Sequence, residues 1–170
     1  MNDPSLRVAT AADLPSLKRA LYLAATWRGE RPDWSQDRVL DHEYFARYWK
    51  DWGRPGDFGV VAEVESAVVG AAYARRFTHD DHGHGFLDEA TPEITIGVEP
   101  EHRGHGIGTG LLGELAAVAR DAGVVALSLS TEVDNPARRL YARTGYEIVG
   151  EDEDAFVMVL RIGHSGSTEP

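Results

Sequence analysis

The residues with the clearest chemical potential lie between a predicted strand and a predicted helix. The segment 98–110 reads VEPEHRGHGIGTG, with a glycine at every second position from 104 to 110. Arg103 directly precedes the first of these glycines, and His105 follows it. Glycines let the backbone approach a ligand closely, and the first amides of a helix carry partial positive charge. The segment is therefore predicted to bind a phosphate or pyrophosphate group.

Two common phosphate-binding motifs fit this segment poorly. A P-loop needs a lysine after its last glycine, but Thr109 follows Gly108 directly. The dinucleotide fingerprint G-x-G-x-x-G is matched by Gly108, Gly110 and Gly113, yet the match lies inside the predicted helix and not at the end of a strand. A glycine-rich turn that only connects a strand to a helix remains the structural alternative.

A third pattern, R-x-x-G-x-G, is complete at Arg103, Gly106 and Gly108. Glu93 starts the preceding strand, and N-P-A-R-R-L-Y from Asn135 and T-G-Y follow the next strand. With R-x-A-T-x-x-D from Arg7, these motifs resemble the GNAT superfamily over about residues 6–161. The resemblance implies an N-acetyltransferase that moves an acetyl group from acetyl-CoA to a primary amine by direct attack in a ternary complex.

The resemblance also implies which residues bind acetyl-CoA. Backbone amides of the turn hold the pyrophosphate, the end of the preceding strand pairs with the pantetheine arm, and the Val98 N–H faces the developing oxyanion. The implied cofactor-binding residues are Ile96, Val98, Arg103, Gly104, His105, Gly106, Ile107, Gly108, Thr109, Gly110, Asn135 and Arg138. For Asn135 a plain helix cap, and for Arg138 a solvated cation, stay open as alternatives.

Two residues are implied to be catalytic. Amines ionise near pH 10, so a base helps at neutral pH, and Glu93 lies where many family members place one. An exposed edge glutamate is the alternative, and Glu99, Glu101 and His102 are rivals for which solvated charge is favoured. Tyr141 is implied to protonate the departing sulfur, the alternative being a half-buried packing tyrosine.

Hydrophobic periodicity predicts the elements that position these residues. The expected order is βααβββαβαββ, which makes an α/β fold with a mixed sheet and helices on both faces. The strands are expected at 7–10, 58–64, 68–77, 93–98, 124–131, 146–149 and 155–160, and helices after the capping box at Thr10 and Asp13, at 37–52, from Ile107, and from Asn135 to Gly145. Residues 1–162 are expected to form a single domain, and residues 163–170 a disordered C-terminal tail.

Two regions are candidates for the acceptor site. The second predicted helix and its approach are rich in aromatic residues and carboxylates, which suit either a core or a cleft wall that attracts a cation. These residues are Trp27, Trp34, Tyr44, Phe45, Tyr48, Trp49 and Trp52, with Glu30, Asp33, Asp37, Asp41 and Glu43. The loop HDDHGH at 79–84 matches no zinc spacing, so a mobile loop beside the acceptor is favoured over a metal site.

Composition limits the partners. The 170 residues include no cysteine, which excludes disulfides and a thiolate nucleophile, and the net charge of −11 argues against nucleic acid and anionic membrane. No long apolar run or secretion signal is present, so a cytoplasmic location is expected. The acceptor, a small molecule or a peptide or protein amine, is not identified. A non-catalytic acetyl-CoA-binding sensor or partner-binding module is the alternative function, and a homodimer stays open.

Overall fold

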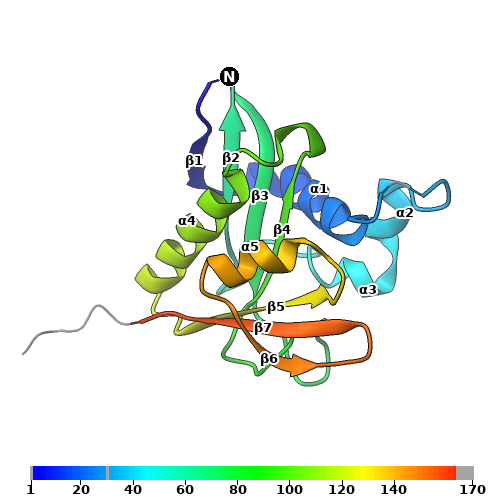
Figure 1. Cartoon of the computed structure of the whole chain (residues 1–170), viewed down its shortest axis with the longest axis vertical. Helices are drawn as coiled ribbons and strands as arrows, with labels where there is room; N and C mark the ends of the chain where they lie inside the picture. The colour runs from blue at the N-terminus through cyan, green and yellow to red at the C-terminus, as the bar shows by residue number, and fades with distance from the viewer. Residues whose placement is uncertain (1, 30, 164–170) are drawn as a thin grey trace, which may run out of the picture.

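The computed structural model describes residues 2–29 and 31–163, so Glu30 and all of the predicted tail except Gly163 lie outside the described residues. Within these residues the strands form one sheet of seven, in the order β1-β2-β3-β4-β5-β7-β6 (Figure 1). The strands are β1 (Ser5–Val8), β2 (Phe58–Val64), β3 (Ala67–Arg75), β4 (Glu93–Val98), β5 (Ala126–Glu132), β6 (Glu147–Glu151) and β7 (Ala155–Arg161). Only β4 and β5 pair in parallel, so the predicted mixed sheet is confirmed.

Helices cover both faces of this sheet, as the sequence predicts. The helices are α1 (Leu14–Ala25), α2 (Gln36–Asp41), α3 (Glu43–Ala46), α4 (Ile107–Asp121) and α5 (Ala137–Arg143). The largest core cluster lies between the sheet and α4, where Leu111, Leu112 and Leu115 are fully buried. A second cluster packs Leu17 and Ala20 of α1 against β2 and β3 on the opposite face. None of these helices combines the length and hydrophobicity that crossing a bilayer requires.

The helix predicted at 37–52 is wrong in the middle and at its end, because α2 ends at Asp41 and α3 covers only Glu43–Ala46. The structure breaks it at His42, whose extended backbone (φ −66°, ψ 132°) separates α2 from α3. The ring Nδ1 of His42 accepts a hydrogen bond from the Tyr44 amide at 3.1 Å and so caps the second helix. The spacing of the aromatic residues cannot reveal such a break, because the apolar side chains before and after His42 pack against the rest of the protein whether or not the helix is continuous. The break lets Tyr48 turn toward the sheet, into a cluster with Leu21 and Phe77.

The strands β4 and β5 diverge, and this opening positions the site. Their pairing is confined to Glu93 and Ser128, beside a hydrogen bond from the Ser128 amide to the Pro92 carbonyl at 2.9 Å. On its other edge β4 pairs with β3 along its whole length. Since the Glu99 amide binds the Val69 carbonyl, antiparallel alternation aims the backbone groups of Ile96 and Val98 into the opening.

Gly97 brings α1 directly against β4. A Cβ at this position would lie only 2.4 Å from the Ala20 carbonyl oxygen, so no side chain fits between the helix and the strand. The close contact carries the C-terminal end of α1, with Leu21 and Ala25, to the edge of the opening between β4 and β5. The helix therefore forms one wall of the site.

Candidate active site

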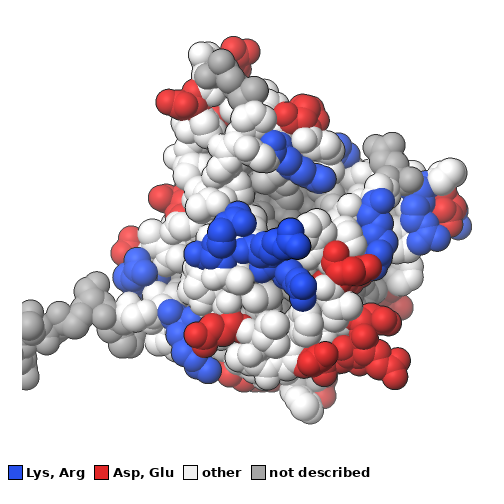
Figure 2. Space-filling model, viewed as in Figure 1, with Lys and Arg blue, Asp and Glu red and all other residues white. Residues whose placement is uncertain are grey.

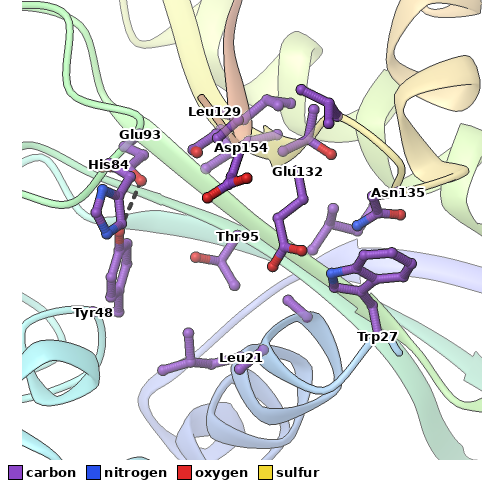
Figure 3. A pocket seen from close by; sticks show the side chains of 18 of the residues that line it. Leu21, Trp27, Tyr48, His84, Glu93, Thr95, Leu129, Glu132, Asn135 and Asp154 are labelled. Atoms are coloured by element: carbon purple, nitrogen blue, oxygen red, sulfur yellow. Dashed lines mark hydrogen bonds between the residues drawn. The ribbon is translucent and has the colours of Figure 1, made fainter. Parts of the chain in front are cut away.

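A cavity of about 1080 Å³ occupies the opening between β4 and β5. Residues of α1, of the segment after α3, of both strands, of α5 and of the turn before β7 line it. Figure 3 looks into this cavity: Glu93 and Tyr48 lie at one end, Trp27 and Asn135 at the other, and the carboxylates of Asp154 and Glu132 point into the space between them. The cavity therefore joins parts of the chain that are more than 100 residues apart in sequence.

Glu93 lies buried at the inner end of this cavity. Only 5% of the residue is exposed, and its Oε1 accepts hydrogen bonds from the Tyr48 hydroxyl at 2.8 Å and from the Gly85 amide at 3.1 Å. Oε2 has no hydrogen-bond partner in the described part of the chain. Burial raises the pKa of Glu93 to about 7, although the two hydrogen bonds lower it. The exposed edge glutamate considered as an alternative is therefore wrong, and the group can take up and release a proton near neutral pH.

The loop before β4 is shaped around Glu93. A Cβ on Gly83 would lie 1.6 Å from the Tyr48 hydroxyl oxygen, and a Cβ on Gly85 would lie 2.8 Å from Glu93 Oε1. Arg47 holds the loop from outside through an ion pair with Asp81 at 2.9 Å. The sequence analysis did not predict that Tyr48, Gly83, Gly85 and Arg47 support Glu93. The alternating glycines of the loop are the sequence signal that the loop packs closely against neighbouring side chains.

Tyr141 lines the same cavity from α5. The side chain is buried, and this burial raises its pKa to about 12, so the hydroxyl stays protonated at neutral pH. Its ring meets Tyr146 edge to face at 6.0 Å. Asn135 also lines the cavity, and its Oδ1 accepts a hydrogen bond from the Ala137 amide at 2.9 Å. The structure thus confirms the capping contact of Asn135 and brings Tyr141 and Glu93 to one cavity.

The glycine-rich turn leaves several backbone amides outside the hydrogen bonds of α4. The first bond into the helix runs from the Gly110 amide to the Gly106 carbonyl at 3.0 Å, so the amides at 104–109 precede the helical ladder. Gly104 (φ 76°) and Gly106 (φ 82°) adopt left-handed backbone conformations, and a Cβ on either would meet no atom within 4 Å. The surface of the turn is therefore open to a ligand. Gly104 and Gly106 are needed for the left-handed backbone of the turn and not for close packing.

Arg103 holds the turn in place, and the charges on the surrounding surface are separated by sign. Arg103 donates from Nε to the Val98 carbonyl at 2.9 Å, which ties the turn to the end of β4. Basic side chains gather over α5 at the centre of the face drawn in Figure 2, whereas acidic ones gather over the end of β6 and β7. Arg138, one of the basic residues of α5, is exposed. An anion would meet favourable charge on the α5 side, and a cation on the β6–β7 side.

The rival bases are placed elsewhere. Glu99 forms a two-bond ion pair with Arg19, at 2.7 and 2.9 Å, and this pair lowers the pKa of Glu99. Glu101 is exposed. None of Glu99, Glu101 and His102 lines the cavity, and no group of three His, Asp or Glu side chains in the described residues is arranged to hold a metal ion.

The chain matches a protein-family model described as the acetyltransferase (GNAT) family over residues 23–146. Among curated proteins it is similar to a mycothiol acetyltransferase of Arthrobacter sp., with 28% identity over 82% of this chain. The match spans 42% of the length of that relative.

Solved structures show the same fold. The PaiA N-acetyltransferase of Thermoplasma acidophilum, solved in complex with coenzyme A, superposes with a TM-score of 0.64 at 16% identity, covering 94% of this chain and 99% of the other. The ribosomal-protein-alanine N-acetyltransferase of Brucella melitensis superposes with a TM-score of 0.61 at 27% identity, covering 92% and 99%.

Proposed function

Since the chain belongs to the acetyltransferase (GNAT) family, we propose that it transfers an acetyl group from acetyl-CoA to a primary amine by direct attack within a ternary complex. The observation that carries the proposal is the buried Glu93, which lines the cavity where β4 and β5 diverge and whose Oε2 has no hydrogen-bond partner among the described residues. Residues 1–162 are proposed to act as one catalytic domain. The related structure solved with coenzyme A supports the choice of donor.

The residues present fit acetyl-CoA. The amides at 104–109 suit a pyrophosphate, the open backbone edge at Ile96 and Val98 suits an amide-bearing arm, and the cations of α5 suit a further phosphate. The proposed cofactor contacts are Ile96, Val98, Arg103, Gly104, His105, Gly106, Ile107, Gly108, Thr109, Gly110, Asn135 and Arg138. The side chain of Ile107 is buried, so its contact is through the backbone. When bound, acetyl-CoA supplies the acetyl group as a thioester.

Glu93 is proposed as the general base. An alkylammonium ion loses its proton near pH 10 in water, so an acceptor arrives protonated at neutral pH. A carboxylate with a pKa of about 7 is ionised at slightly alkaline pH and still basic enough to accept that proton. Tyr48 and Gly85 hold Oε1, which leaves Oε2 as the atom that receives it.

Two further groups complete the proposed machinery. The Val98 N–H, on the unpaired edge of β4, is proposed to donate a hydrogen bond to the acetyl oxygen as negative charge develops there. The Tyr141 hydroxyl, protonated because its pKa is about 12, is proposed to give a proton to the departing sulfur. Both groups carry a proton at neutral pH, as these roles require.

The test is release of free thiol by the purified protein with acetyl-CoA and a panel of amines. Glu93→Gln and Tyr141→Phe are each expected to lower kcat by roughly 10²- to 10⁴-fold, the range for loss of a general acid or base. Matched controls are Glu147→Gln, an exposed residue of β6, and Tyr146→Phe, a neighbouring buried tyrosine that does not line the cavity. Both controls are expected to retain activity.

Binding of acetyl-CoA without turnover would favour the alternative, non-catalytic function. If acetyl-CoA raises the melting temperature but no amine yields thiol, the chain is a non-catalytic acetyl-CoA-binding module. Failure to bind acetyl-CoA would contradict the proposed donor and with it the assignment of the turn.

A further inference from the structure

The cavity extends well beyond Glu93, and its outer part is strongly acidic. Six carboxylic residues line it but only one arginine, Arg28, among the described residues. The carboxylic residues are Glu93, Glu132, Asp134, Asp152, Glu153 and Asp154. Because walls of one sign of charge concentrate counter-ions, the outer cavity favours a cationic group.

Arg28 neutralises only part of this charge. It forms ion pairs with Glu132 at 2.7 Å and with Asp134 at 2.8 Å. The carboxylate of Asp154 has no hydrogen bond and no basic side chain within ion-pair distance in the part of the chain that the structure describes. Asp154 is held by its backbone, since its carbonyl accepts from the Val133 amide at 3.0 Å beside the end of β5. Its free carboxylate therefore sits on a fixed backbone beside Glu132.

Two buried polar atoms of residues that line the cavity have no hydrogen-bond partner within the part of the chain that the structure describes. Glu93 Oε2 and Thr131 Oγ1 both lack a hydrogen-bond partner in the described residues, although only 5% and 4% of these residues is exposed. Both residues line the cavity. Buried polar atoms are costly when unpaired, so a ligand with hydrogen-bond donors would satisfy groups that the protein leaves open.

Glu93 and the outer carboxylates of the cavity lie a defined distance apart. Glu93 pairs with Ser128, and Glu132 lies four residues farther along β5, which places it roughly 13 Å away along the strand. The lining of the cavity also includes apolar and aromatic groups such as Leu21, Trp27 and Trp34. Such a channel suits an extended hydrocarbon chain with a positive charge at each end.

We infer that the acceptor is a linear aliphatic diamine or polyamine whose reacting amine lies at Glu93 while a second ammonium group lies between Asp154 and Glu132. The inference rests on the proposed function and narrows its substrate class. In the reaction a bond forms between the amine nitrogen and the acetyl carbon while the carbon–sulfur bond breaks. Glu93 takes one proton from the reacting ammonium and Tyr141 gives one to the sulfur. The second proton that the nitrogen loses as the amide forms replaces the proton of Tyr141, and the second ammonium is unchanged.

The test compares acceptors of equal length that differ only in the charge of the far end. Hexamethylenediamine carries a second cation, aminohexanol a neutral hydroxyl and aminocaproate an anion. We expect kcat/KM from thiol release to be about tenfold higher for the diamine than for aminohexanol, and lower still for aminocaproate. The difference should reside in KM, because the far group is remote from the reacting atoms.

Asp154→Asn should remove most of the preference for the diamine while leaving kcat/KM for aminohexanol nearly unchanged. Glu147→Gln, which removes a carboxylate outside the cavity, should preserve the preference. Thiol release that is as fast with aminohexanol as with the diamine would overturn the inference and leave the proposed function intact.

Calorimetric titration with hexamethylenediamine tests the second cation site independently of the proposed acetyltransferase activity. If no amine is acetylated, the proposed function fails; binding of the diamine that Asp154→Asn weakens by about tenfold would still support the second cation site. Absence of diamine binding to the unsubstituted protein would overturn it.

Discussion

Glu93 combines burial with a missing hydrogen-bond partner, and the cost of this arrangement is measurable. Its pKa of about 7 in the folded protein lies above the ordinary value of 4.5. The folded state therefore binds the proton more tightly than the unfolded chain does. The contribution of Glu93 to the stability of the protein falls as the pH rises from about 4.5 to about 7 and is not regained above that range.

Glu93→Gln should therefore stabilise the protein at alkaline pH while it removes activity. Above pH 7 the free energy of unfolding should rise by up to roughly 3 kcal/mol, because the glutamine amide never has to be ionised in the buried site. The gain should shrink toward zero as the pH falls to about 4.5. Denaturant unfolding at several pH values measures it, with Glu147→Gln as the control. An unfolding free energy that is unchanged or lower at pH 8 would show that Glu93 is not destabilised by ionisation.

Individual residues could be assigned from sequence only where a motif fixed their position. The resemblance to the GNAT family implies Glu93, Tyr141 and Asn135 as site residues, and the structure brings all three to one cavity. Their proposed roles in catalysis and cofactor binding stay predictions. Tyr48, which donates to Glu93 across 45 residues of sequence, could not be assigned in this way. Its placement depends on the break at His42, where one side chain caps a helix that the hydrophobic pattern reads as continuous.

At the scale of elements, the contact between α1 and β4 depends on one glycine. Gly97→Ala should destabilise the protein by about 2–4 kcal/mol, since the new Cβ would overlap backbone atoms of Ala20, which cannot move without shifting the helix. The same shift should weaken acceptor binding, because α1 forms a wall of the cavity. Thermal and denaturant unfolding measure the first effect, and KM for the amine measures the second.

Gly113→Ala is the matched control. Gly113 lies within α4 and a Cβ there would meet no atom within 4 Å, so the substitution should stabilise by about 0.5–1 kcal/mol through helix propensity. If Gly97→Ala were as stable as the Gly113→Ala protein, the close approach of α1 to β4 would be contradicted.

Sequence patterns predicted elements well where periodicity was unambiguous. The strands at 58–64 and 93–98 and the start of the helix at Ile107 are confirmed to the residue. The divergence of β4 and β5 has no local signature, since it arises from which strands meet across the sheet and how far their pairing extends. The acidic outer cavity likewise requires the ends of α1, β5 and β6 to meet, and these ends are distant in sequence.

For the whole molecule, the net charge of −11 is unevenly distributed. Acidic groups line the acceptor cavity, whereas basic side chains gather over α5, next to the proposed path of the cofactor (Figure 2). This division lets one surface attract a cationic acceptor and another attract an anionic donor. The described carboxylates that the sequence analysis suggested for attracting a cation do not line the cavity: Asp33, Asp37, Asp41 and Glu43. The carboxylates that do line its outer part come from the end of β5 and from the turn before β7.

The pH dependence of kcat/KM for the amine, followed by thiol release from about pH 6 to about pH 9, tests the central claim most directly. If Glu93 removes the proton from a bound ammonium ion, kcat/KM rises with a break near pH 7 and then levels off, because the carboxylate is fully ionised above its pKa. Glu93→Gln should lack this break. A rate that climbs steadily toward the pKa of the free amine, without a break near pH 7 and alike in both proteins, would contradict the assignment of Glu93 as the base.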